Sequence, residues 1–321
     1  MAHMVETMAY AGATPWHGLG DKVDNKMTPA QMMAASKADW TVSKRPIHFD
    51  SKGKMVQIPG QYAIVRDTDE SMLTMVGSTY KPIQNEQMFD FFTKFTKAGH
   101  MTMETAGSLA GGKYVWALAR VGKDFKIGTG GKKPDNVAPF LLILSPHVHG
   151  KALVMQYTAI RVVCWNTLNM ALGSMLKGSK HAFKMSHSAK WEVEKDEAEK
   201  VLGIAMAQTE EFKDASNLMA KTKAKKEDVE AFFKRVLRVE LFPDKKKSPV
   251  MLPKFRAALE KAPGATLPSA AGTWWGALNA VTYVVDHETG VSRDTALRGA
   301  WIGNHAQTKR RALSLALELA K

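Results

Sequence analysis

The stretch ILSPHVHGKALVMQYTAIRVVCWNTLNMAL, residues 143–172, contains side chains that could do chemistry. His147 and His149 are one residue apart, so in an extended segment both would project to one side, where they could bind a metal ion. Cys164 is the only cysteine of the chain and would need a nearby imidazole to act as a nucleophile. This stretch has no Asp or Glu to complete a metal site, and no protease or transferase signature surrounds the cysteine. We therefore expect histidines at a hairpin tip and a buried cysteine.

The same stretch lies in a longer window, residues 136–191, that contains no carboxylate. Acidic groups would repel phosphate, so their absence from a basic segment favours a surface that binds a polyanion. The whole chain points the same way, with a formal net charge of +14 and an isoelectric point near 9.6. The basic residues of the window are Lys151, Arg161, Lys177, Lys180, Lys184 and Lys190.

Cations and aromatic residues alternate in this part of the chain, which is the combination that single-stranded nucleic acid requires. The segment GTGGKK, residues 128–133, lacks the spacing of an ATP-binding loop and is better interpreted as a flexible basic loop that contacts phosphate. The residues that we expect to contact nucleic acid are Lys113, Arg120, Lys132, Lys133, Lys151, Tyr157, Arg161, Lys177 and Lys180.

Length and composition predict a folded protein of two domains, or of one domain with a large appendage. The chain has 321 residues, of which 45% are hydrophobic and 24% charged, as in ordinary globular proteins. A single cysteine cannot form an internal disulfide. No run of about 18 apolar residues and no N-terminal basic and apolar signal occur, so we expect a cytoplasmic protein without a membrane span.

Hydrophobic periodicity divides the chain into a mixed half and a helical half. Thr28 and Pro29 predict a helix start, residues 60–83 predict a hairpin around an acidic loop, and further strand pairs are expected around Gly111 and around His147. Met88, Phe91, Phe92 and Phe95 have helical spacing and are expected in the core, with Asn85 as a cap.

A helix is also expected from about residue 159 to 175, because Val163, Leu168, Leu172 and Met175 can share one face. Later helices are expected at 191–220, 226–239, 252–261, 273–287 and 304–320, with a linker at 242–254. The predicted fold class is α+β, a curled antiparallel sheet backed by helices, with domains at 1–190 and 191–321.

Several motifs resemble the phage- and plasmid-borne family known as domain of unknown function 932 (DUF932). They are TPWHGLG (14–20), DWTVSKRP (39–46), RVVCWNTLNMAL (161–172), GTWWGALNAVTYVVDH (272–287) and KRRALSLALELA (309–320). The resemblance spans nearly the whole chain and implies an association with replication and recombination of mobile elements. It supplies no catalytic residue.

The order of strands, hairpins and helices is also similar to annealing proteins of the Rad52, Redβ and Erf type. This resemblance implies a non-enzymatic protein that binds single-stranded DNA, promotes annealing and forms a ring or filament of identical subunits, without a cofactor. The resemblance also implies phosphate contacts from the helix that starts near Arg161, whose early backbone amides would add a positive dipole end. Cys164, Asn166 and Thr167 would then build a junction between sheet and helix. Two other hypotheses remain open: a metal-assisted nuclease using His147, His149 and Asp286, and a host-interaction or structural protein.

Overall fold

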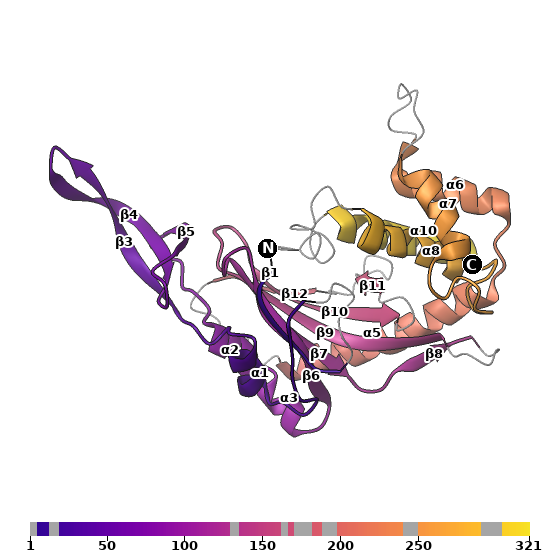
Figure 1. Ribbon diagram of the computed structural model, residues 1–321, viewed down its shortest axis with the longest axis horizontal. Helices are drawn as coiled ribbons and strands as arrows, with labels where there is room; N and C mark the ends of the chain where they lie inside the picture. The colour runs from indigo at the N-terminus through magenta and orange to yellow at the C-terminus, as the bar shows by residue number, and fades with distance from the viewer. Residues whose placement is uncertain are drawn as a thin grey trace. The chain divides into compact units, whose positions relative to one another are not determined.

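A computed structural model describes residues 5–12, 19–128, 135–161, 166–169, 182–187, 198–239, 250–289 and 304–321 (Figure 1). The chain forms two compact units. Unit 1 comprises Met1–Gly122, Leu141–Gln156 and Ala182–Ile204, and unit 2 comprises Lys123–Phe140, Tyr157–His181 and Ala205–Lys321. The units therefore do not follow the predicted boundary at residue 190, because segments from the first half of the chain belong to unit 2.

The first half of the chain is built mainly from strands, and the second half from helices. The strands are β1 (Val5–Tyr10), β2 (Asp21–Lys22), β3 (Val42–Ser51), β4 (Lys54–Arg66), β5 (Met72–Gly77), β6 (Met101–Leu109), β7 (Tyr114–Val121), β8 (Phe125–Ile127), β9 (Asp135–Pro146), β10 (Leu153–Arg161), β11 (Asn166–Asn169) and β12 (Ala182–Met185). The helices are α1 (Pro29–Ala35), α2 (Asn85–Asp90), α3 (Thr93–Lys97), α5 (Ala198–Lys221), α6 (Lys226–Leu237), α7 (Met251–Lys261), α8 (Trp274–Tyr283), the π-helix η4 (Val284–Glu288) and α10 (Asn304–Ala320). This α+β composition and the helical C-terminal half confirm the coarse fold class.

The larger sheet has the strand order β11-β10-β9-β7-β6-β1-β2, with β12 paired to β10 and β8 paired to β9. Apart from the short parallel pair β1–β2, the registers determined for it are antiparallel. The predicted strand pair around Gly111 is β6–β7, in which Leu109 faces Tyr114. The predicted pair around His147 is β9 and β10.

The predicted helix near Arg161 is wrong, because the chain there continues as a strand. Ile160 pairs with Thr167 and Arg161 with Asn166 in the antiparallel hairpin β10–β11. The apolar spacing that suggested a helix spans this hairpin and residues 170–175, which lie outside the described part. The argument that a helix dipole assists phosphate binding at Arg161 therefore fails.

The smaller sheet has the order β3-β4-β5 and contains the predicted hairpin at 60–83. The acidic loop between β4 and β5 is held by two arginines. Arg66 donates to Asp69 and to Glu6 (Nη1–Oε1 2.7 Å), and Arg45 donates to Glu70 and Asp67. These contacts balance the charge of the carboxylates in a loop whose residues 67–70 are exposed to solvent.

The helices of unit 1 follow the expected local signals with one exception. Thr28 caps α1 through a capping box with Gln31, and Pro29 occupies the first turn. Met88 and the three phenylalanines of the predicted stripe are buried, although a break between α2 and α3 divides the stripe between two helices. The N-cap of α2 is Gln84, so the prediction that Asn85 is the cap was wrong.

The core of unit 2 is a chain of aromatic side chains that links its helices to its strands. Phe212 of α5 contacts Phe125 and Trp275, with both ring centroids 6.1 Å away. The buried carboxylate of Asp135, at the start of β9, accepts hydrogen bonds from Trp275 Nε1 (2.9 Å) and Ser269 Oγ (2.7 Å). None of the helices within the described ranges is long and apolar enough to cross a membrane.

Gly276 on α8 gives a test of this packing. A Cβ atom at this position would lie 2.0 Å from the carbonyl oxygen of Ala270. Gly276→Ala should therefore destabilise the protein by roughly 1–3 kcal/mol through overpacking, despite the higher helix propensity of alanine. Gly203→Ala on α5 is the matched control, because a Cβ there meets nothing within 4 Å and should stabilise by up to about 1 kcal/mol. Urea unfolding of both variants checks the opposite signs, and equal effects would contradict the packing argument.

Candidate nucleic-acid interface

Several residues predicted to contact nucleic acid lie outside the part of the chain that the structure describes. They are Lys132, Lys133, Lys177 and Lys180. Cys164, which was expected to be buried, also lies outside that part. The backbones of Arg161, Asn166 and Thr167 are described and pair in β10 and β11, but their side chains are not. For these residues the predicted contacts stay predictions.

Tyr157 does not present a stacking surface, so its prediction as a base contact was wrong. Its side chain is 1% exposed and belongs to the hydrophobic core of unit 2 with Phe212 and Phe125. Alternate residues of a strand point to opposite faces of the sheet, and the sequence did not show which face of β10 meets the core.

Arg120 and Lys113 do not form one cationic stripe. Lys113 precedes the first residue of β7, whereas Arg120 lies near the end of that strand, about 23 Å along an extended chain. The Nε of Arg120 lies 3.5 Å from Oε2 of Glu104, which balances much of its charge. Of these two cations, Lys113 is exposed and Arg120 is partly buried.

Lys113 and Lys151 lie on turns of unit 1 that backbone hydrogen bonds connect. The N–H of His147 donates to the carbonyl of Lys113 at 2.9 Å, and the N–H of Lys151 donates to Val148 at 3.3 Å within the β9–β10 turn. The N–H of His149 donates to Oγ1 of Thr74 on β5 at 3.2 Å. The β6–β7 turn, the β9–β10 turn and β5 therefore meet at one end of unit 1.

Lys81 follows β5 and belongs to the same end of unit 1. Its N–H donates to the carbonyl of His187 at 3.1 Å, and Lys44 holds the preceding loop by donating from Nζ to the carbonyls of Ser78 and Tyr80. We call the exposed side chains of Lys81, Lys113 and Lys151 the lysine rim. No local pattern indicated that Lys81 would join the two later lysines, since it lies 32 positions before Lys113 along the chain.

A buried polar cluster fixes the loops that carry the lysine rim. Nε2 of His147 lies 2.9 Å from Oδ1 of Asn85, and Nδ2 of Asn85 donates to the carbonyls of Ala38 (3.0 Å) and Trp40 (3.1 Å). Because the Asn85 amide donates twice, its oxygen is the acceptor, and Nε2 of His147 carries the proton. Nδ1 of His147 then keeps a lone pair, and no hydrogen-bond partner for it exists among the described residues.

His187 completes this cluster from the segment after β12. Its Nδ1 accepts from the backbone N–H of Ile83 at 3.4 Å, so its proton is on Nε2. Its ring stacks on Tyr80 with centroids 4.8 Å apart. Burial lowers the pKa of His147 to about 3, with His187 as a second cause, and burial lowers the pKa of His187 to about 4. Both imidazoles are therefore neutral near pH 7 and structural in this arrangement.

The lysine rim differs from the arginines in its electrostatic environment. Arg45, Arg66, Arg120, Arg235 and Arg256 each lie within ion-pair distance of a carboxylate. Within the described ranges, Lys81, Lys113 and Lys151 have no ion-pair partner. Cations without acidic partners are available to the phosphates of a nucleic acid.

The residues of the nuclease hypothesis have separate environments. His147 is buried against Asn85, whereas His149 is exposed on the turn, and Asp286 belongs to unit 2, where Lys309 donates to it at 2.6 Å. Among the described residues, no three His, Cys, Asp or Glu side chains gather as they would to hold a metal ion. Within the described part of the chain, His147, His149 and Asp286 therefore do not form a metal site.

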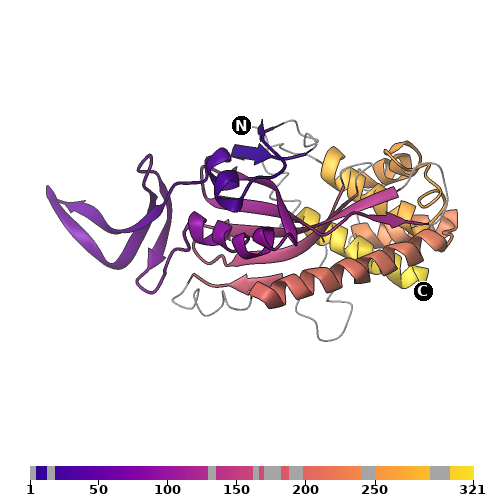
Figure 2. The same ribbon diagram turned by 90° about the horizontal axis from the view of Figure 1, so that it is seen from below.

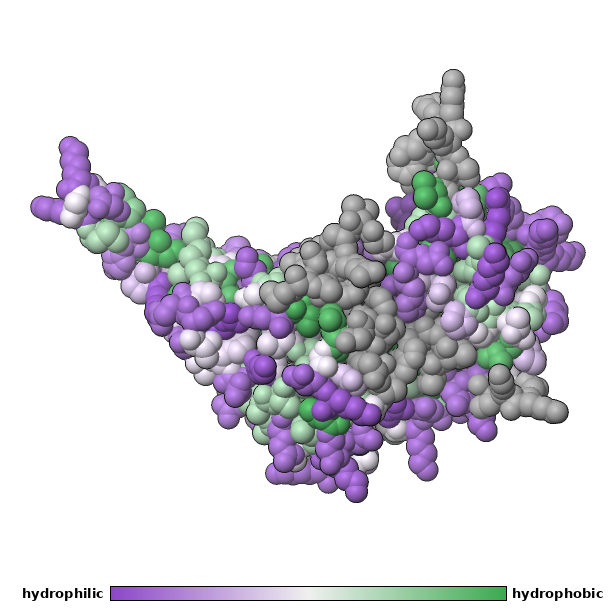
Figure 3. All heavy atoms as spheres, in the orientation of Figure 1, coloured by the Kyte–Doolittle hydropathy of each residue, from purple (hydrophilic) through white to green (hydrophobic). Residues whose placement is uncertain are grey.

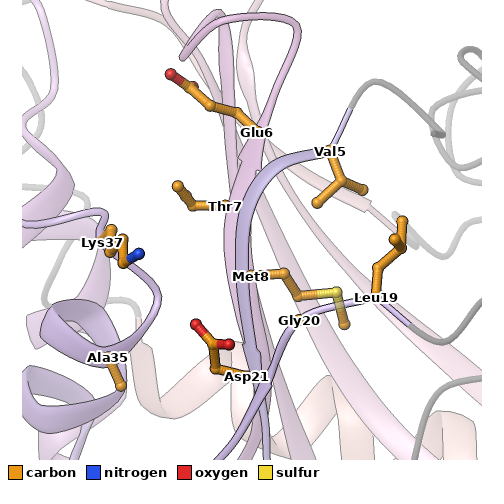
Figure 4. Close-up of a pocket in the computed structure, with 9 residues that line it drawn as sticks. All are labelled: Val5, Glu6, Thr7, Met8, Leu19, Gly20, Asp21, Ala35 and Lys37. Carbon is orange, nitrogen blue, oxygen red and sulfur yellow. The ribbon is translucent and has the colours of Figure 1, made fainter. Parts of the chain in front are cut away.

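A cavity of about 380 Å³ in unit 1 lies beside β1 and β2 (Figure 4). Asp21 and Lys37 line it together with the apolar side chains of Val5, Met8 and Leu19. Glu6 also lines it, but its carboxylate already binds Arg66 and Ser108. The charges of Asp21 and Lys37 balance each other, so the cavity has no excess of positive charge that would favour phosphate.

Comparison with known proteins gives one match. No curated protein and no solved structure matches the chain, so the resemblance to Rad52-type annealing proteins is not confirmed. The family model described as a domain of unknown function (DUF932) matches residues 72–313, which include the three lysines of the rim and the polar cluster beneath them. Because this match covers more than half of the chain, the protein belongs to the DUF932 family.

Proposed function

We propose that this protein binds single-stranded DNA through the lysine rim and promotes annealing of complementary strands during recombination or replication of a phage or plasmid. The observation that carries the proposal is the exposure of three lysines without ion-pair partners on loops that a buried polar cluster holds together. A surface intended only for solubility would not need its cations fixed on connected turns. Binding requires no nucleotide and no metal ion, and the protein acts as a homo-oligomer.

The charge of the chain supports a polyanionic ligand beyond the rim itself. The formal net charge of the chain is +14, and most described arginines are paired with carboxylates, so lysines supply much of the accessible positive charge. Arg161, Lys177 and Lys180, all in the carboxylate-free window, remain proposed contacts. A single strand would gain affinity mainly from phosphate contacts. Its affinity should fall steeply with rising salt concentration, because the entropy gained when binding releases counterions becomes smaller.

The lysine rim can be tested by charge removal. Lys81→Gln, Lys113→Gln and Lys151→Gln together should weaken oligonucleotide binding about 100-fold at low salt, at roughly 1 kcal/mol for each solvated charge pair. The slope of log affinity against log salt should become shallower by about 2, at 0.7 for each phosphate contact. Fluorescence anisotropy with a labelled single strand measures both quantities.

The matched control removes the same charge from unit 2. Lys225→Gln, Lys226→Gln and Lys261→Gln replace three exposed lysines at the ends of helices and should keep affinity within about threefold of the unchanged protein. Equal losses in both triple variants would show that net charge alone governs binding. An unchanged protein without affinity for oligonucleotides at low salt would refute the proposal.

Annealing and cleavage are distinguished with the same protein. Two complementary labelled strands should anneal faster in its presence without added nucleotide, and the rim variant should lose this acceleration. If labelled DNA is instead cleaved with magnesium or manganese, and His149→Ala abolishes the cleavage, the nuclease hypothesis replaces the annealing function.

A further inference from the structure

Strands β3 and β4 extend beyond the third strand of their sheet (Figures 1 and 2). The register of β4 with β5 covers Gln61–Val65 only, whereas β3 and β4 also pair from His48–Gln57 to Ser51–Lys54. We call residues 47–58 the arm. A two-stranded hairpin alone is marginally stable in water, so an arm of this kind gains from a surface to pack against.

The two faces of the arm carry different side chains. Phe49 faces Val56 across the two strands, and we call their side the apolar face. The opposite side carries the pairs His48–Gln57 and Asp50–Met55, which are mostly polar. Phe49 is 49% exposed and Val56 is 41% exposed. The apolar face is thus open to solvent over both strands.

Exposed large apolar side chains concentrate on this small sheet. Of eight such residues among those that the structure describes, five lie on β3, β4 and β5, and Figure 3 shows green and pale green spheres along this part of unit 1. The five are Phe49, Met55, Val56, Met72 and Met75. A gathering of this kind marks an interaction surface rather than scattered surface hydrophobics.

The end of the arm is positively charged. Lys52 and Lys54 are exposed and have no ion-pair partner within the described ranges, and Oδ1 of the one acid nearby, Asp50, accepts from the N–H of Gly53 at 2.9 Å. A partner surface complementary to the arm would therefore be apolar and would carry acidic groups beside its apolar side chains. Phe49 is the one aromatic side chain among the five exposed apolar residues, and the other four, one valine and three methionines, offer bases no stacking plane, which favours a protein partner over a nucleic acid.

Helix α5 carries a surface of that kind along its exposed side. Met206 (55% exposed) and Leu218 (38% exposed) lie at the two ends of a stripe, with the exposed acids Glu210, Glu211 and Asp214 between them. Glu210 is paired with Lys213 of the same helix at 2.9 Å, so Glu211 and Asp214 are the acids that would meet the lysines of a partner. The twelve residues from Met206 to Leu218 span about 18 Å of helix. The arm from Ile47 to Ser51 spans about 14 Å, so it fits within the length of the stripe.

We propose that the apolar face of the arm of one copy packs on this α5 stripe of a second copy, with Lys52 and Lys54 beside its carboxylates. The two surfaces differ, so the contact is heterologous, and repeating it generates a ring or a filament. The contact does not involve the lysine rim. Its formation therefore does not depend on nucleic acid, and it can fail or succeed independently of the proposed function.

Charge exchange between the two surfaces tests this interface in nuclease-treated full-length protein by sedimentation velocity over a concentration series. Lys52→Glu with Lys54→Glu, and separately Glu211→Lys with Asp214→Lys, should each raise the dissociation constant of self-association about tenfold or more. An equimolar mixture of the two variants should assemble again, because each arm then meets a stripe of opposite charge. Lys123→Glu with Lys126→Glu changes net charge as much as the arm variant and should leave assembly unchanged.

The apolar part is tested by Phe49→Ser with Val56→Ser, which should abolish assembly while circular dichroism and oligonucleotide affinity of the monomer stay unchanged. A protein that is monomeric at every concentration overturns the inference. So does an assembly that survives both the arm and the α5 variants, or a mixture that stays dissociated. An arm variant that assembles normally but loses oligonucleotide binding would assign the arm to nucleic acid instead.

Discussion

Lys309→Ala should lower the free energy of unfolding by about 3–5 kcal/mol, because it leaves the carboxylate of Asp286 buried without its ammonium partner. Lys309 Nζ donates to Asp286 Oδ1 at 2.6 Å, and the side chains are only 1% and 4% exposed. Burial lowers the pKa of Lys309, and the neighbouring Asp286 opposes that change. The charged pair is stable in this interior because each member neutralises the other.

The ion pair connects two elements of unit 2 through an otherwise apolar contact. Lys309 comes from α10 and Asp286 from the π-helix η4, and α10 buries Ala306, Ala312 and Leu313 on the same helix. A π-helical turn is uncommon and changes the direction of the side chains at the end of α8. The pair therefore also sets the position of η4 against α10.

The solvent exposure of an ion pair determines how much stability is lost when one partner is removed, and an exposed pair in the same unit provides a matched control. Arg235 and Glu318 form an ion pair at 3.1 Å between exposed side chains, so Arg235→Ala should cost less than about 1 kcal/mol. The double variant Lys309→Met with Asp286→Leu should recover most of the stability that Lys309→Ala loses, since no charge remains buried. Denaturant unfolding at pH 7 measures all three. A loss of the same size for Lys309→Ala and Arg235→Ala would contradict the burial argument.

Local sequence signals predicted those elements whose boundaries local chemistry defines. Thr28 and Pro29 began a helix as expected, because a capping side chain and a fixed φ act within one turn. The acidic loop around residue 69 separated two strands for a similar reason. The helix predicted at Arg161 was wrong because a run of apolar residues is compatible with both helix and strand, and pairing with Asn166 stabilises the strand.

The candidate site depends on contacts that no local pattern contains. Asn85 and His147 are 62 positions apart, and the Ile83–His187 contact spans 104 positions. Sequence reasoning could see a histidine and an asparagine but not that one fixes the proton of the other. It likewise could not separate paired arginines from unpaired lysines, because ion pairs such as Arg66–Glu6 form between distant segments.

Acid should destabilise the protein through His147 and His187 between about pH 6.5 and pH 4. The folded pKa values of about 3 and about 4 lie below the value of 6.5 for an unfolded chain, so the unfolded state binds more protons in this window. Stability is therefore complete above pH 6.5 and falls as the pH decreases toward the folded pKa values. At pH 4.5 each histidine should cost about 2–3 kcal/mol.

The geometry explains why neither ring accepts a second proton. A proton on Nδ1 of His147 would find no acceptor among the described residues, and a proton on Nδ1 of His187 would face the N–H of Ile83. His305 of unit 2 contributes in the same direction, because burial lowers its pKa, with the charge of Lys309 assisting and that of Asp286 opposing. The carboxylates with lowered pKa values, such as Asp67 and Asp69, lose their contribution below this window.

Urea unfolding at pH values from 7 to 4.5 tests this in three variants. His147→Gln should be less stable at pH 7 but should show a shallower fall with pH, by about one proton of slope at its acidic end. His305→Gln measures the contribution of unit 2 separately. His149→Gln replaces an exposed imidazole on the same turn and should retain the slope of the unchanged protein. If His147→Gln keeps the full slope while His149→Gln loses part of it, the buried cluster is not the acid-sensitive element of unit 1, and the fixed position of the lysine rim would need another cause.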